Sequence, residues 1–265
     1  MSSNKTIEQY FYGQGRIFLR PVGSTGNGGW RWIGDMSSLT FGGTDEQATH
    51  KESFSGQKSS VRKFSIGGDR TLNGVIHQVD TNILAELLRG TVTEIPPGTV
   101  TAEPFPQSVV VGDTIKLDFP YNVSDLVITD SAGSPVTLSQ EHYDAFLEHG
   151  SIELLSLPGA PGALTQPLKA AYKHAGARQV AFFNAPPKEM QLRYEGINLA
   201  EGNAPVIVEL YKVSTAPLQE LALITSGTEL AGMNYQAECL ADASRPANGP
   251  LGRFGRYVQI NPITP

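Results

Sequence analysis

The chain has 265 residues, of which 40% are hydrophobic and 17% are charged, and its formal net charge is −6. Its 28 glycines and 18 prolines exceed average usage but stay below the level of a low-complexity chain. These figures exclude a low-complexity chain and indicate a folded, turn-rich protein of one or two domains that can bury a sizeable core.

The single cysteine, Cys239, cannot form an intrachain disulfide, so we expect a reducing or redox-indifferent compartment. The first ten residues lack the apolar run of a secretory signal. No apolar stretch reaches the roughly 18 residues of a membrane-spanning helix, so we expect no membrane segment. The acidic balance, without a basic block, disfavours tight binding to nucleic-acid phosphates.

Apolar residues recur mostly at period two, which predicts a mainly β fold. Short β-prone runs at residues 16–20 and 30–33 flank a glycine-rich turn at 21–29 and predict a hairpin, and a third run follows at 38–41. Residues 42–60 are polar, with Phe54 as the one large apolar side chain. We expect a long loop there, of the kind that is usually functional or disordered.

Strand-like residues resume at 61–66 and 70–79. The pair Asn73-Gly74 ordinarily marks a turn, but it leaves too few flanking residues for a convincing hairpin, so its structure stays open. Residues 80–89 change to helical periodicity, with an N-cap at Asp80 or Thr81 and a stop at Gly90. The expected apolar stripe is Ile83, Leu84, Leu87 and Leu88, and Arg89 would complement the helix dipole.

Prolines make residues 95–106 resemble a linker, because proline disfavours both helix and central strand. We therefore expect a boundary there. Residues 1–99 and 186–265 would form one β domain, and residues 100–185 a small sandwich-like, β-rich insert. Seven short runs in and near the insert favour strands, at residues 108–111, 114–119, 125–128, 136–138, 151–155, 168–172 and 180–183.

The last third shows the clearest alternation, in residues 189–195, 206–211 and 233–239. Such strands have one core face and one wet face. The wet face would present four carboxylates: Glu189, Glu195, Glu209 and Glu238. An irregular stretch follows, and the chain closes with a strand-like run at residues 256–260.

The search for chemistry finds no catalytic constellation and no cofactor motif. His142 and His149, with Glu141, Asp144 and Glu148, form the one cluster that resembles a metal site, but it lacks the i,i+4 histidine pair of a helical zinc motif. Cys239 occupies an apolar strand position and is interpreted as a core residue. Trp30 and Trp32 are interpreted as hairpin packing rather than as a base-stacking platform. We expect neither an enzyme nor a bound metal or cofactor.

Several segments resemble the major tail tube proteins of long-tailed, siphovirus-like bacteriophages. They are Tyr10-Phe-Tyr-Gly-Gln-Gly-Arg-Ile-Phe-Leu19, Phe41, His50-Lys-Glu-Ser-Phe-Ser-Gly-Gln57, residues 140–155 and Leu251-Gly-Arg-Phe-Gly-Arg-Tyr-Val258. The chain departs from the family pattern in two places. Asn73-Gly74 interrupts a strand that the family keeps continuous, and the turn at residues 23–29 is longer than the pattern needs.

The resemblance implies a tail-tube-type β-sandwich or barrel with one short helix. Copies would close into hexameric rings, and stacked rings would form a hollow tube that delivers DNA to the host without binding it specifically. The implied partners are the chain itself, tail proteins at the tube ends and a tape measure protein in the lumen. The location would be the tail tube of the virion, assembled in the bacterial cytoplasm.

The resemblance also assigns roles to residues. Loop 42–60 would contact the neighbouring subunit or ring, with Phe54 as anchor and with polar contacts from His50, Lys51, Glu52 and Lys58. The four strand glutamates would line the bore, where negative charge repels phosphate. The terminal arms, residues 1–10 and 243–265, would cover a neighbour with Phe254, Tyr257 and Ile260.

Three other functions compete with a tube subunit. A tail completion or distal tail protein would share the fold and form a single ring. A carbohydrate- or peptide-binding β-sandwich would stay monomeric and present an aromatic groove. An enzyme is the weakest alternative, because no acid–base or nucleophile pattern emerges.

Overall fold

A computed structural model of the chain describes residues 9–26, 28–78, 80–228 and 230–260. The fold is mainly β, with 46% of residues in strands and 6% helical, as the sequence predicted. The chain divides into unit 1, Met1–Thr91 with Val180–Pro265, and unit 2, Val92–Gln179. In the described ranges no helix has the length and apolar character needed to cross a bilayer.

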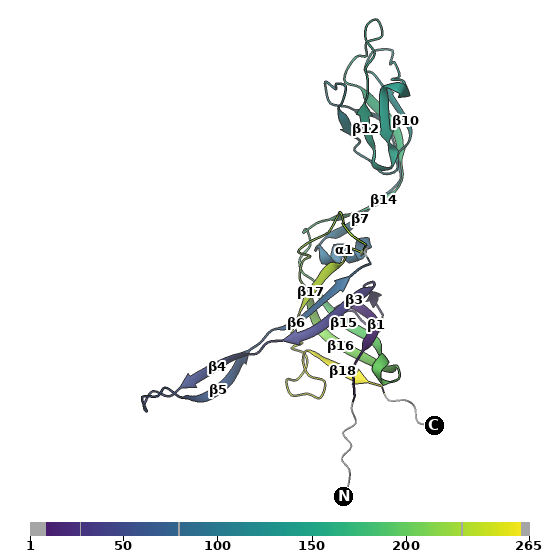
Figure 1. Ribbon diagram of the computed structural model, residues 1–265. Coiled ribbons are helices and arrows are strands. Elements are labelled where there is room, and N and C mark those ends of the chain that lie inside the picture. Colours follow the sequence, from purple (N-terminus) through teal and green to yellow (C-terminus); the bar gives the residue numbers. More distant parts are fainter. Residues whose placement is uncertain (1–8, 27, 79, 229, 261–265) are drawn as a thin grey trace, which may run out of the picture. The chain divides into compact units, whose positions relative to one another are not determined.

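Unit 1 is built on an eight-stranded antiparallel sheet (Figure 1), counted over the described residues. The strand order is β2-β1-β15-β16-β17-β6-β3, and β18 pairs with β16 outside this path. The strands are β1 (Gly13–Pro21), β2 (Arg31–Trp32), β3 (Met36–Gly43), β6 (Arg70–Ile76), β15 (Glu189–Asn198), β16 (Ala204–Thr215), β17 (Met233–Cys239) and β18 (Gly255–Gln259). Pairing of Phe18 with Trp32 confirms the first predicted hairpin.

One face of this sheet supplies the core of unit 1. Inward-facing residues from β1, β6, β15, β16 and β17 pack with the predicted helix, and the buried set includes Ile17, Leu72, Leu192, Val213 and Tyr235. The same strands show the period-two burial that their sequences indicate. Cys239 is part of this core, as expected.

The predicted helix exists as α1 (Thr81–Leu87). Asp80 is the N-cap, and its carboxylate accepts hydrogen bonds from the backbone N–H groups of Asn82 and Ile83, both at 2.7 Å. The expected ending is wrong in one detail. Arg89, not Gly90, takes the left-handed conformation, with φ of 46°, and its guanidinium donates to the carbonyl of Thr215 at 3.2 Å.

Asn73 and Gly74 lie in the middle of β6, so they form no turn. Gly74 pairs with Leu39 of β3 on one side and with Tyr235 of β17 on the other. A Cβ at Gly74 would lie 2.5 Å from Cε of Met36 and 2.6 Å from the carbonyl oxygen of Ser38. Glycine is therefore required by the close approach of the neighbouring strand.

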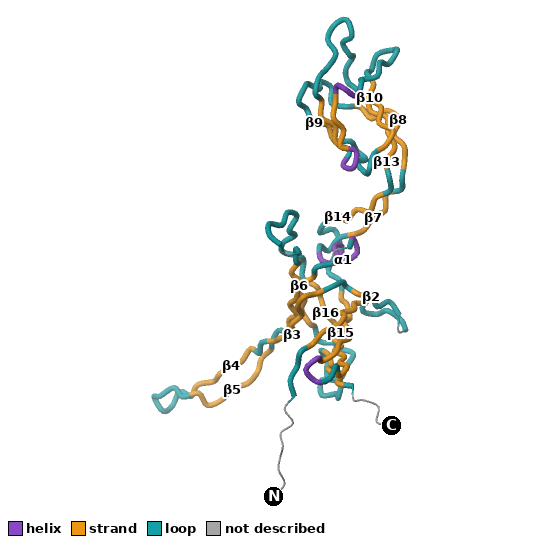
Figure 2. The backbone as a smooth tube through the Cα atoms, turned by 45° about the vertical axis from the view of Figure 1, so that its right-hand side comes forward, coloured by secondary structure: helices purple, strands orange, loops and turns teal. Residues whose placement is uncertain are grey.

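The prediction of a long loop over residues 42–60 is wrong. The chain forms strand β4 (Glu46–Lys51), a turn at residues 52–59 and strand β5 (Ser60–Gly67). Among the described residues these strands pair with each other alone, and they form a hairpin (Figure 2). The sequence did not indicate β4 because the strand buries neither face, and so its side chains show no apolar alternation.

Unit 2 has its own core between two three-stranded sheets, β10-β13-β8 and β11-β12-β9. Its strands are β8 (Gly98–Pro104), β9 (Thr114–Lys116), β10 (Ser124–Thr129), β11 (Tyr143–Phe146), β12 (Ser151–Leu154) and β13 (Lys169–His174). Strands β7 (Thr91–Ile95) and β14 (Ala177–Ala181) form a separate two-stranded ribbon. Short 3-10 turns occur at Gln140–His142 and Leu147–His149, and in unit 1 at Leu199–Glu201.

The expected linker at residues 95–106 is wrong over most of its length, because β8 occupies Gly98–Pro104. β8 is an edge strand, paired only with β13, and an edge position tolerates the proline at its end. The division between the units lies within the β7–β14 ribbon rather than at 99/100 and 185/186.

Gly74→Ala should lower the free energy of unfolding of unit 1 by about 1–3 kcal/mol, because the new methyl group overlaps a backbone carbonyl that cannot move freely. Gly42→Ala is the matched control, since a Cβ there meets no atom within 4 Å. Both tryptophans lie in unit 1, so urea unfolding followed by tryptophan fluorescence measures the change. Equal destabilisation by the two variants would contradict this account of β6.

Candidate assembly surfaces

The β4–β5 hairpin carries all five residues that the sequence assigned to inter-subunit contact. Phe54 is 89% exposed at the tip, and His50, Lys51 and Lys58 are exposed beside it. Sequence reasoning missed three further apolar side chains on β5: Val61, Phe64 and Ile66 are 57%, 50% and 61% exposed. The strand-like run at residues 61–66 was recognised from the sequence. The polar sequence of β4 gave no sign of the strand that pairs with it, so the hairpin was not predicted.

Glu52 has a different place from the other four. It is 5% exposed, and its carboxylate accepts hydrogen bonds from the backbone N–H groups of Phe54 and Ser55 and from the Ser55 hydroxyl. These bonds hold the pKa of Glu52 below its usual value, and the bond from the Ser55 hydroxyl contributes most. Glu52 therefore shapes the hairpin tip from within and offers no surface contact.

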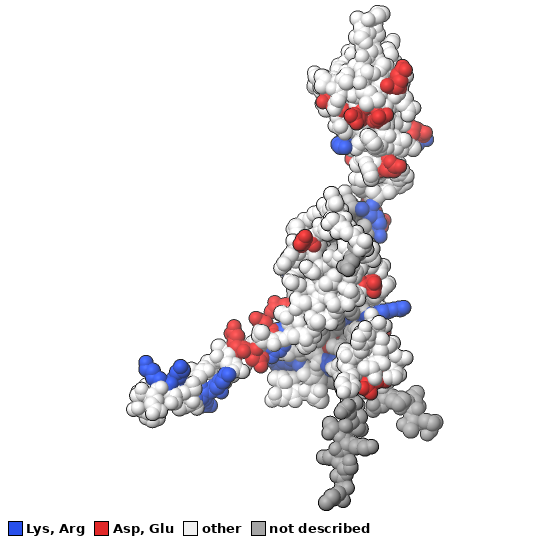
Figure 3. All heavy atoms as spheres, in the orientation of Figure 1, with Lys and Arg blue, Asp and Glu red and all other residues white. Residues whose placement is uncertain are grey.

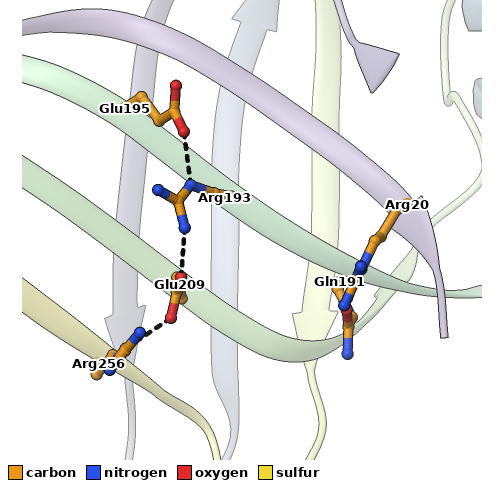
Figure 4. Close-up of polar contacts among 6 residues, drawn as sticks. All are labelled: Arg20, Gln191, Arg193, Glu195, Glu209 and Arg256. Atoms are coloured by element: carbon orange, nitrogen blue, oxygen red, sulfur yellow. Dashed lines mark hydrogen bonds and ion pairs between the residues drawn. The ribbon is translucent and has the colours of Figure 1, made fainter. Parts of the chain in front are cut away.

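The wet face of the main sheet carries a row of charged side chains (Figure 4). Glu209 lies between two guanidinium groups, 2.6 Å from Arg193 and 2.6 Å from Arg256, and Arg193 also donates to Glu195 at 2.6 Å. Strand register explains the row, because Glu209 is directly opposite both Arg193 and Arg256. Sequence reasoning identified the carboxylates but not their cations, Arg193 of β15 and Arg256 of β18.

The four predicted bore-lining glutamates therefore differ in their surroundings. Glu195 and Glu209 are in this row, and Glu189 pairs with Lys212 at 2.8 Å. Glu238 is exposed and makes no ion pair within the described ranges. The face is thus largely charge-balanced. Three of the four glutamates that were expected to present unpaired negative charge are in ion pairs instead.

Burial pushes the pKa of Glu209 upward, but the hydrogen bonds and charges of Arg256 and Arg193 outweigh burial and leave the pKa below its usual value. A carboxylate with a lowered pKa stabilises the folded state at neutral pH. That contribution diminishes as the pH falls below 4.5 and disappears once the pH is below the folded-state pKa.

The C-terminal residues pack on unit 1 more than the prediction of an irregular arm implied. Phe254 packs against the core of unit 1, and Tyr257 lies in β18, which pairs with β16. Ile260 is partly exposed and its backbone N–H donates to the carbonyl of Pro205 at 3.0 Å. The outermost parts of both predicted arms, residues 1–8 and 261–265, lie outside the described residues.

A groove of about 980 Å³ opens between the start of β1 and β3. Its lining is mostly apolar and aromatic and includes Phe11, Leu39, Phe41, Phe254 and Tyr257. Phe11, Phe41 and Tyr257 are more than half exposed. Exposed aromatic surface of this extent marks a region suited to contact with another molecule.

The described residues hold no group of three or more His, Cys, Asp or Glu side chains placed to bind a metal ion. In the suspected cluster, His142 instead contacts the Ser156 hydroxyl at 2.6 Å through Nδ1. Burial raises the pKa of the Cys239 thiol to about 11, so the reactive thiolate is suppressed at neutral pH.

Glu209→Gln should destabilise unit 1 by about 1–3 kcal/mol at pH 7, because two guanidinium groups lose their shared carboxylate. Glu195→Gln is the control, since its side chain is 49% exposed against 18% for Glu209, and it should cost less than about 1 kcal/mol. Urea unfolding by tryptophan fluorescence measures both. The difference between wild type and Glu209→Gln should vanish in acid, and a difference that persists unchanged would contradict the pKa assignment.

Comparison with known proteins identifies the family to which the chain belongs. No curated protein matches the sequence. One family model, described as "Protein of unknown function UCP028589", matches residues 10–258, and this span includes both units. The chain therefore belongs to the family Protein of unknown function UCP028589.

Proposed function

We propose that this chain is a structural virion protein whose copies form stacked hexameric rings, the hollow tail tube through which phage DNA is delivered. The observation that carries the proposal is the β4–β5 hairpin. The hexameric order, the phage context and the DNA-delivery role come from the resemblance in sequence. The exposed hairpin and the open edges of the sheet support self-assembly.

The side chains of the hairpin are more exposed than the folding of a single chain would explain. Every residue of β5 is exposed, and so are five of the six in β4. Isolated two-stranded hairpins are marginally stable in water, and side chains such as Phe54, Phe64 and Ile66 gain nothing from exposure. A second molecule that covers these side chains would supply the missing burial.

The main sheet also leaves both edges open. Among the described residues β3 is the last strand on one side, and on the other side the short segment of β2 and Ile33 covers β1 from Ile17 to Leu19. Unpaired strand edges accept a further strand by backbone hydrogen bonding. Two different edges on one sheet suit head-to-tail pairing between copies, and such pairing forms a ring when the rotation from copy to copy closes.

The charge distribution fits a tube that DNA crosses without adhering. The net charge of −6 lies wholly in unit 2, because acidic and basic residues balance in unit 1. If the wet face lines the bore, it presents ion pairs rather than bare carboxylates. Paired charges leave few free cations for phosphate.

Purified full-length protein, examined by negative-stain electron microscopy at rising concentration, should form hollow filaments of constant diameter. Single rings at every concentration would indicate a tail completion or distal tail component instead. Monomers throughout would contradict the proposal and favour a binding module.

Removal of residues 46–67 should abolish filaments and leave unit 1 folded. The deletion leaves four residues, Thr44, Asp45, Gly68 and Asp69, between the paired residues Gly43 and Arg70, and four residues suffice for a hairpin connection. Circular dichroism and tryptophan fluorescence check the fold. Filaments of unchanged length and yield from the shortened chain would show that the hairpin is not an assembly element.

A further inference from the structure

Charge is divided along the β4–β5 hairpin. Its distal half carries four cations, Lys51, Lys58, Arg62 and Lys63, while the single carboxylate there, Glu52, is turned into the tip. Its base carries Asp45, Glu46 and Asp69. Figure 3 shows the same division, with blue atoms toward the tip and red atoms at the base. Each copy of the chain therefore has a basic and an acidic surface on one element.

Apolar side chains accompany the basic half. Arg62, Phe64 and Ile66 alternate along β5 and so share one face of the hairpin. Ala48 is opposite Phe64, and His50 is opposite Arg62, which places them on that face as well. The face thus combines a cation at its distal end with a continuous apolar strip.

The acidic base adjoins the aromatic groove of unit 1. Asp45 lies 2.6 Å from Arg70, whose guanidinium lies 5.8 Å from the centre of the Phe254 ring. Phe254 and Phe41 line the groove, and Phe41 is in β3 just before the hairpin begins. Acidic and apolar surface are therefore continuous, in the order needed to receive the basic and apolar face described above.

We propose that the distal half of the hairpin of one copy docks on the hairpin base and groove of a second copy. The cations face Glu46 and Asp69, since Asp45 is already paired with Arg70, and Phe64 and Ile66 enter the groove. This inference rests on the proposed self-assembly and names the two surfaces that meet. Because the surfaces differ, one copy contributes its tip and the other its base, and head-to-tail repetition of this contact would generate the rings and filaments of the proposed function.

A second copy is the occupant that the charges favour. Within one chain, the paired strands hold the tip away from the base by about 3.3 Å per residue, so a hairpin cannot reach its own base without losing its register. Tip-to-tip and base-to-base contacts would juxtapose like charges, which disfavours them. The charges thus favour contact between the tip of one copy and the base of another.

The test uses two charge-reversed full-length chains, Arg62→Glu/Lys63→Glu at the tip and Glu46→Lys/Asp69→Lys at the base. Each alone should raise the critical concentration for assembly at least about tenfold. A mixture of the two should restore assembly, because each reversed surface then meets its complement on the other chain. Sedimentation and electron microscopy measure the assemblies, and circular dichroism checks folding. Arg62→Glu and Glu46→Lys provide a milder pair if a double variant fails to fold.

Lys188→Glu and Asp144→Lys are the controls, because they reverse exposed charges that are not part of the hairpin and should leave assembly unchanged. Assembly of either hairpin variant at the wild-type concentration would overturn the docking inference while leaving the tube proposal intact. A loss that mixing does not restore would also overturn it. If wild-type protein forms no assembly at all, both the inference and the proposed function are wrong.

Discussion

The β4–β5 hairpin leaves large apolar side chains that the described residues of its own chain do not bury. One face of the antiparallel sheet and the short helix α1 form the core of unit 1, and this core contains no described residue of β4 or β5. The long pairing of β3 with β6 supports the hairpin at its base, but support at the base does not cover Phe54, Phe64 or Ile66. The proposed self-assembly would meet this need, because every further copy would offer the same groove and the same acidic base.

Charge placement reinforces the distinction between the two units. Unit 1 is neutral as a whole, yet it sorts its charges locally into ion pairs on the sheet and into opposite ends of the hairpin. Unit 2 carries the whole net charge of −6 on a separate core. Net charge of one sign favours solubility and discourages association, whereas local complementarity directs it. Within the proposed tube, unit 1 would make the contacts and unit 2 would keep the particle soluble.

Sequence periodicity was sufficient wherever a strand buries one face. β17 was predicted at its observed bounds, and the runs predicted for β15 and β16 lie within longer strands. Residue type offered Asp80 or Thr81 as the cap of α1, and the structure shows Asp80. Periodicity was insufficient where no face is buried, as in β4, and where an edge strand tolerates proline, as in β8. The glutamates of the wet face were recognised, but their neutralisation by Arg193, Arg256 and Lys212 depends on cross-strand register, which period-two alternation does not specify.

Hydrogen exchange of the β4–β5 amides tests most directly whether a second copy covers the hairpin. In dilute protein these amides should exchange rapidly, because the hairpin is exposed on both faces and opens locally, while β15 and β16 remain protected. At concentrations at which the protein assembles, the hairpin amides and those of residues 36–43 should become strongly protected together, since one copy covers the other. Equal, rapid exchange of the hairpin in dilute and assembled protein would contradict the claim that a second copy covers it.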